Sequence, residues 1–166
     1  MLDDDAFADV VSANTAYAAQ FGLSGLPALA AKGLAVLTCM DSRIDPLGML
    51  GLAPGDAKIL RNAGARVTDD VLRTLVLARY LLGVERFMVA AHTRCRMAGG
   101  TEAEVHASVA EARGPDTRSL SFLTSADQEE DVRGDVQRVR SWPYLSGLTV
   151  AGFILDLDTG RLRRVC

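Results

Sequence analysis

The sequence predicts an α/β fold, in which a mainly parallel sheet is flanked by helices and preceded by an N-terminal helical arm. Three apolar runs of strand length lie at residues 34–39, 57–62 and 86–92, and segments with helical patterning separate them. Strands that alternate with helices are typical of parallel sheets. The composition agrees, because 49% of the residues are hydrophobic and only 5% are aromatic, which favours a core of Ala, Val and Leu.

The first element in chain order is the arm. Residues 3–21 begin with three aspartates and carry apolar residues at roughly helical spacing before Gly22, which predicts an amphipathic helix. The stretch GLSGLPALAAKG that follows indicates a linker. A length of 166 residues suits one domain. We therefore expect a single domain over residues 1–166, with arm and linker at 1–32 and an α/β core at 33–166.

The helix predicted at residues 68–83 connects the second and third strands. Thr68 is a suitable N-cap, two acidic residues occupy the first turn, and Gly83 ends the segment. Apolar residues surround most of its circumference, which predicts burial on more than one side. Because a small domain rarely surrounds a helix so fully, we expect part of this surface, together with the arm, to contact a second copy of the chain.

Three further elements complete the expected fold. Residues 101–113 predict a helix, and residues 126–142 predict a charged, exposed helix despite Gly134. Residues 148–165 predict a final strand, a turn at 158–160 and a short return strand.

Charge and composition argue against several classes of protein. The net charge is −3, and no basic block interleaved with aromatic residues indicates nucleic-acid binding. An acidic N-terminus without an apolar span of membrane length gives no signal for secretion or membrane insertion, so we expect a cytoplasmic protein. Three scattered cysteines are too few for a disulfide framework and indicate free thiols or metal ligands.

Cys39, His92 and Cys95 form a candidate metal site. Cys39 ends the first predicted strand, and the motif HTRC puts His92 and Cys95 at the end of the third. In open α/β sheets ligands bind at this edge, and two sulfurs with one imidazole suit zinc with a fourth position open for water or substrate. Taken singly, each cysteine could be a small buried side chain and His92 a hydrogen-bonded core histidine. Their joint placement favours the metal.

Asp41 and Arg43 follow the first candidate ligand by two and four residues. On their own, they are explained by a salt bridge or a cap within a loop. Beside a metal, the carboxylate could accept a hydrogen bond from a bound water molecule, and the guanidinium could hold that carboxylate off the metal by two bonds.

The motifs CMDSR, ILRNAGA and HTRC resemble, in order and rough spacing, those of the β-class carbonic anhydrases. The short chain most resembles the small bacterial members of that family. The resemblance covers about residues 33–97. It implies that Cys39, His92 and Cys95 bind zinc, that Asp41 and Arg43 are catalytic, and that a zinc-bound hydroxide hydrates carbon dioxide reversibly to bicarbonate. It also implies a homodimer or a multiple of dimers, in which the arm reaches across to the neighbouring subunit.

Two positions bear on the substrate. Gly64 in RNAGA could simply permit a turn with positive φ, but the resemblance implies that this loop lines the cleft, which makes Gly64 a candidate substrate contact. Arg96 stands where the family usually has glycine, two residues after Arg94, and could bind bicarbonate or another anion at the mouth of the site.

Other functions remain open from the sequence. A bicarbonate- or metal-binding regulatory protein, or a zinc hydrolase of a related small molecule such as carbon disulfide, could use the same fold. His106 could transfer protons or be a surface or interface residue.

Overall fold

The computed structural model describes residues 6–166 and contains a five-stranded mixed sheet of order β2-β1-β3-β4-β5. The first four strands run parallel and the last returns antiparallel to its neighbour. The strands are β1 (Leu34–Cys39), β2 (Ala57–Asn62), β3 (Arg86–His92), β4 (Thr149–Leu155) and β5 (Leu162–Arg164). The predicted fold class is therefore confirmed, and the three apolar runs form strands with the expected bounds.

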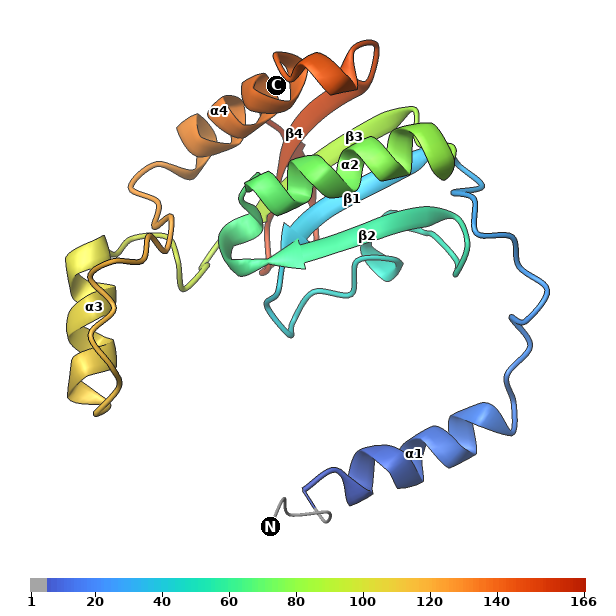
Figure 1. Ribbon diagram of the computed structural model, residues 1–166, viewed down its shortest axis with the longest axis horizontal. Coiled ribbons are helices and arrows are strands. Elements are labelled where there is room, and N and C mark those ends of the chain that lie inside the picture. The colour runs from blue at the N-terminus through green and yellow to red at the C-terminus, as the bar shows by residue number, and fades with distance from the viewer. Residues whose placement is uncertain (1–5) are drawn as a thin grey trace.

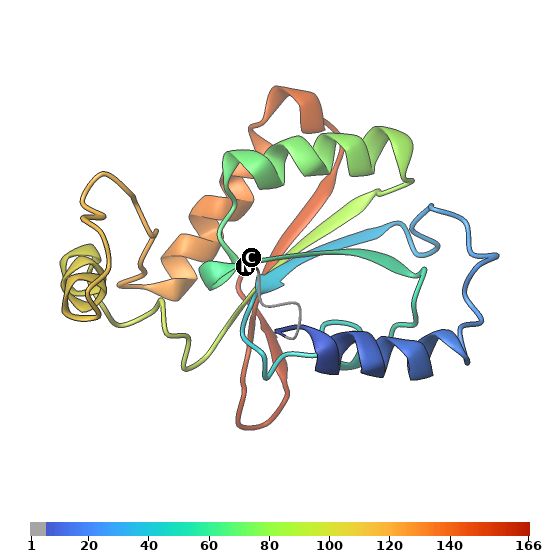
Figure 2. The ribbon, with the colours of Figure 1, turned by 60° about the horizontal axis from the view of Figure 1, so that its bottom comes forward.

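Two helices cover one face of the sheet. Figures 1 and 2 show α2 (Asp69–Leu81) and α4 (Gln128–Arg140) on the same side of the strands. Leu72 and Leu75 of α2 and Val136 of α4 belong to the same buried cluster as Leu37 of β1 and Val89 of β3. Side chains alternate between the two faces of a strand, so every second residue of the central strands points into this core.

The other face of the sheet is covered by short segments of the chain. Val36 and Met88 pack there against Met49 and Leu50 of the 3-10 helix η1 (Gly48–Leu50) and against Leu162 of β5. The central strands are thus buried on both faces, which explains why the sequence shows continuous apolar runs where a half-exposed strand would show alternation.

The prediction of an exposed helix at residues 126–142 was wrong for one side of α4. Val132, Asp135, Val136 and Val139 are buried. The three valines recur at intervals of four and three residues, which forms an apolar stripe that packs on β3 and β4. The many charges around this stripe dominate the composition and obscured it.

Within one chain, α2 is buried on one side, and the expected contact of its remaining apolar surface with a second copy stays a prediction. Thr68 caps the helix as expected, accepting a hydrogen bond from the Val71 amide. Its buried residues lie on one face, whereas Leu77, Tyr80 and Leu81 are 45%, 63% and 66% exposed. The outer side of α2 therefore presents apolar surface.

The arm and α3 stand away from the sheet (Figure 1). Helix α1 (Ala8–Ala18) has no buried residue and exposes Val10, Val11 and Tyr17. Part of the predicted arm helix, residues 3–5, lies outside the described residues. Helix α3 (Glu102–Glu111) starts at a capping box between Thr101 and Glu104 and also buries no residue. Among the described residues, no helix is both long enough and apolar enough to cross a membrane.

Candidate metal centre

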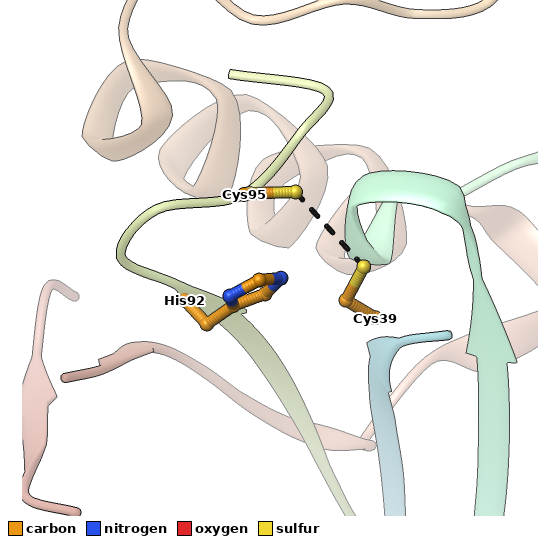
Figure 3. A group of neighbouring side chains, drawn as sticks. All are labelled: Cys39, His92 and Cys95. Atoms are coloured by element: carbon orange, nitrogen blue, oxygen red, sulfur yellow. Dashed lines mark hydrogen bonds between the residues drawn. The ribbon is translucent and has the colours of Figure 1, made fainter. Parts of the chain in front are cut away.

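The ends of two neighbouring strands bring the candidate ligands together. Cys39 is the last residue of β1 and His92 the last of β3, and these parallel strands pair directly. Cys95 lies three residues farther on, in the turn after β3. The three ligand atoms lie within 4.8 Å of one another, and all three residues are buried (Figure 3). The two sulfur atoms are 3.9 Å apart.

The histidine ring presents a free nitrogen to this cluster. His92 Nδ1 lies 2.9 Å from the Thr93 carbonyl oxygen, to which it can donate a hydrogen bond, and burial lowers the pKa of the imidazole and favours its neutral form. That hydrogen bond leaves a lone pair on Nε2, which is buried and has no hydrogen-bond partner within residues 6–166. Buried polar atoms are rarely left unpaired, so the nitrogen fits a metal ligand.

The charge of the two thiols also favours a bound metal ion. Burial, followed by the neighbouring Cys39, raises the pKa of the Cys95 thiol. Two thiolates so close together in a buried site repel each other unless a cation lies between them. A pair of sulfurs and an imidazole is a donor set that suits zinc and leaves a fourth position open. These residues therefore fit a zinc ion.

Arg43 holds the Asp41 carboxylate through both of its oxygens. Its Nε donates to Oδ1 at 2.9 Å, its Nη2 to Oδ2 at 2.6 Å, and its backbone amide to Oδ1 at 3.0 Å. The guanidinium hydrogen bonds hold the pKa of Asp41 well below its usual range, and the carboxylate raises the pKa of Arg43. Oδ2 also lies 3.9 Å from His92 Nε2, so a clamped, ionised carboxylate borders the metal cluster.

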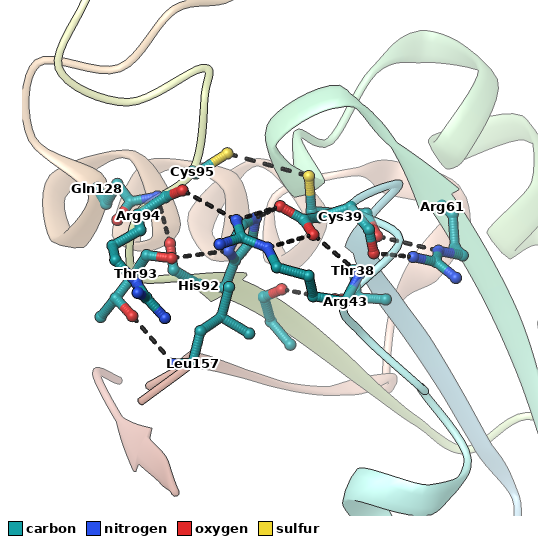
Figure 4. Close-up of polar contacts among 12 residues, drawn as sticks. Thr38, Cys39, Arg43, Arg61, His92, Thr93, Arg94, Cys95, Gln128 and Leu157 are labelled. Atoms are coloured by element: carbon teal, nitrogen blue, oxygen red, sulfur yellow. Dashed lines mark hydrogen bonds and ion pairs between the residues drawn. The ribbon is translucent and has the colours of Figure 1, made fainter. Parts of the chain in front are cut away.

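The turn after β3 is fixed by contacts that the sequence did not indicate. Arg43 Nη2 donates to the Arg94 carbonyl at 3.2 Å (Figure 4), and the Arg94 side chain pairs with Asp158 at 2.8 Å. Gln128, at the start of α4, donates to the His92 carbonyl at 3.0 Å. No local motif indicates these contacts, because their partners lie far away in the sequence.

Arg96 and Gly64 line two different cavities of this region. A cavity of about 500 Å³ opens over the site and is lined by Cys39, Asp41, Arg43 and Arg96, among others. Arg96 is exposed and makes no ion pair or side-chain hydrogen bond within the described chain. Gly64 has a φ of 76° and lines a cavity of about 10 Å³ with Arg66 and Ser125, and this cavity also borders Cys95.

His106 lies on α3, away from the residues that line the mouth of the site. Its Nδ1 is 2.9 Å from Thr117 Oγ1, and its ring packs against Phe122. These contacts join α3 to the loop that follows it, which is a structural role.

Known proteins resemble this chain over nearly its whole length. The sequence profile of the carbonic anhydrase family matches residues 34–162. Beta-carbonic anhydrase 1 of Mycobacterium bovis is 35% identical over 95% of this chain and 96% of its own. The crystal structure of carbonic anhydrase from Streptococcus mutans is similar with a TM-score of 0.90 and 40% identity, covering 100% of both chains. A carbon disulfide hydrolase of an Acidianus species is 46% identical over 78% of this chain and 75% of its own.

Proposed function

The chain belongs to the β-class carbonic anhydrases, and from this premise we propose that it hydrates carbon dioxide reversibly to bicarbonate at a zinc ion held by Cys39, His92 and Cys95. The observation that carries the proposal is the cluster of two buried sulfurs and one unpaired imidazole nitrogen within 4.8 Å, beside a clamped carboxylate. Zinc in such a site supplies a nucleophile at neutral pH, because it lowers the pKa of a water molecule toward 7.

Asp41 and Arg43 are the proposed catalytic pair. The low pKa of Asp41 keeps its carboxylate ionised at neutral pH, so it orients a water molecule by accepting a hydrogen bond and does not retain a proton. Arg43 occupies both carboxylate oxygens and thereby keeps the side chain in one position. The pair would align the attacking oxygen with the carbon of the substrate.

Arg96 is the proposed contact for the anionic product. Its guanidinium has no ion-pair partner within residues 6–166 and lines the open cavity with Arg43, and a positive charge there attracts bicarbonate. Gly64 is a second proposed substrate contact, because the small cavity that it lines also borders Cys95, and its positive φ permits the turn after β2.

Hydrolysis of carbon disulfide is the alternative activity, because relatives with that name match the chain. The arginine-lined mouth favours the first activity, since bicarbonate, the substrate of the reverse reaction, is an anion whereas carbon disulfide is a neutral molecule. A regulatory protein that only binds bicarbonate would hold zinc without turnover.

Stopped-flow measurement of carbon dioxide hydration, with elemental analysis and a carbon disulfide assay on the same protein, tests the proposal. We expect one zinc per chain and turnover of carbon dioxide. Cys39→Ser and His92→Ala should each lose zinc and activity, whereas Cys166→Ser, outside the cluster, should keep both. Full zinc occupancy in either ligand variant contradicts the ligand assignment, and turnover of carbon disulfide alone supports the alternative.

We further propose a cytoplasmic homodimer, or a multiple of dimers. The apolar side chains exposed on α1 and on the outer side of α2 support association of two copies. Three cysteines without a disulfide among the described residues support a reducing compartment.

A further inference from the structure

Arg61 contacts the backbone of both functional residues at the end of β1. Its Nε donates to the Cys39 carbonyl at 2.9 Å, and its Nη2 donates to the Asp41 carbonyl at 2.6 Å (Figure 4). We propose that Arg61 is a positioning residue, which fixes the segment 39–41 and so sets the directions of the Cys39 thiol and the Asp41 carboxylate. This inference rests on the proposed function of the zinc site.

The segment needs such a contact because the ladder between β1 and β2 ends there. Cys39 pairs with Asn62 as the last register pair, and the Met40 amide donates to the Asn62 carbonyl at 2.9 Å. Beyond this point the chain leaves the sheet. Its carbonyl groups then require other donors, because backbone polar groups near a core are rarely left unpaired. The Asp41 carbonyl accepts from the Ile44 amide at 3.1 Å within the same loop, and Arg61 adds the donor that links this loop to β2.

A guanidinium is suited to bind two carbonyl groups at once. Its N–H groups form a rigid, planar fork, so the positions of the two acceptor oxygens become fixed relative to each other. Arg61 lies at an exposed position of β2 and makes no salt bridge within residues 6–166. Its described polar contacts are therefore the two carbonyl groups next to the site.

The neighbouring Asn62 acts on a different loop. Its Nδ2 donates to the Arg66 carbonyl at 2.7 Å, and its Oδ1 accepts from the Arg66 amide at 2.9 Å. Asn62 thus closes the turn that contains Gly64, whereas Arg61 holds the end of β1. Arg61 and Asn62, the first two residues of the RNAGA stretch, therefore support the site from β2 and do not line its mouth.

Arg61→Met tests the inference, because it keeps an apolar stem of similar length and removes both donors. A displacement of the reacting groups by about 1 Å can cost roughly 100-fold in rate. We expect Arg61→Met to bind one metal ion per chain, to shift the visible absorption bands of the cobalt(II) form, and to release zinc faster to a chromophoric chelator. The kcat should fall by about 10- to 100-fold with a smaller change in KM.

Two further variants keep the outcome decisive. Arg61→Lys supplies one mobile donor and should recover part of the cobalt spectrum and of kcat. Arg86→Met is the matched control, because Arg86 donates to the Lys32 carbonyl at 3.4 Å at the opposite end of the sheet. It should match the parent protein in metal content, cobalt spectrum, zinc release rate and kcat.

A cobalt spectrum and zinc release rate in Arg61→Met equal to those of the parent would overturn the positioning role. If Arg61→Met does not fold, Arg61→Lys is compared with the parent protein instead. A cobalt spectrum and a zinc release rate equal to those of the parent would then overturn the positioning role. A parent protein that binds cobalt but hydrates no carbon dioxide would refute the proposed function, while the spectra would still decide the role of Arg61.

Discussion

Asp41 and Arg43 show how two adjacent side chains in a short loop can control a reaction centre. The guanidinium satisfies both carboxylate oxygens, and its Nη2 also donates to the Arg94 carbonyl, so the pair is anchored to the turn that carries Cys95. A charge-assisted, bidentate contact of this kind restricts both side chains to one geometry. In the proposed mechanism, the chemistry of the site depends on that restriction.

Replacing Arg43 with alanine should lower activity and leave zinc in place. The carboxylate, now released and 3.9 Å from His92 Nε2, can move into the position that a water molecule needs. We expect kcat to fall by about 10- to 100-fold, as for other residues that orient metal sites, with one zinc per chain by elemental analysis. Arg73→Ala is the control, because Arg73 makes a similar pair with Asp70 on exposed α2. An unchanged kcat would contradict the clamp.

Arg96→Gly should change the response to anions. A guanidinium at the open mouth attracts bicarbonate electrostatically, so its removal should weaken inhibition by bicarbonate or raise turnover. Because the side chain is exposed, the difference between the parent and the variant should shrink as ionic strength increases. Steady-state inhibition at low and high salt measures this. Identical inhibition and turnover at low salt would make Arg96 an ordinary surface residue.

At the scale of elements, one carboxylate joins α3 to its following loop in addition to the contacts of His106. Glu102 accepts hydrogen bonds from the Phe122 and Thr124 amides at 2.9 and 3.0 Å. These two amides are the main reason that the pKa of Glu102 lies below its usual value of 4.5. The helix buries no residue of its own, so these hydrogen bonds contribute much of the stability of α3 and its following loop.

Acid should therefore loosen the loop at residues 115–125. The pKa of Glu102 is lower in the folded chain than in the unfolded chain, so its stabilisation is present above pH 4.5 and is lost as the pH falls through the folded value. Hydrogen exchange at the Phe122 and Thr124 amides, corrected for the intrinsic effect of pH, should accelerate below about pH 4.5.

Glu102→Gln should show faster exchange at these two amides already at pH 7. Glu111→Gln, at the other end of α3, is the matched control, because Glu111 makes no side-chain hydrogen bond within residues 6–166. Exchange rates in Glu102→Gln that equal those of the parent at pH 7 would show that the carboxylate does not hold the loop.

At the scale of the whole molecule, the apolar surface on α1 and α2 leads to a prediction about assembly. Leu81 on α2 is 66% exposed and Val11 on α1 is 64% exposed, and large apolar patches on a protein surface usually mark contacts. We expect light scattering to give a homodimer or a multiple of it. Val11→Lys and Leu81→Lys should each shift the protein toward smaller species on dilution.

Ser12→Lys, at a polar and exposed position of α1 outside the stripe of Val10, Val11 and Tyr17, should behave as the parent protein. A parent protein that remains a stable, active monomer at micromolar concentration would refute the predicted assembly.

The sequence alone determined the central strands and the candidate ligand set. Continuous apolar runs specify buried strands, and residues that end neighbouring parallel strands must meet at one edge of the sheet. Cys39, His92 and the turn with Cys95 follow from this rule without knowledge of any long-range contact. The ordered motifs then indicated the family.

Only the tertiary structure decided which face of each helix is buried and which distant groups the arginines reach. Asp135 of α4 is buried because it accepts from Arg66 Nε at 2.9 Å and from the Val67 amide at 3.1 Å, partners nearly 70 positions away in the chain. The contact of Arg61 with two carbonyl groups likewise depends on how β1 lies beside β2. A long, flexible side chain has many possible partners, and only packing of the whole chain selects among them.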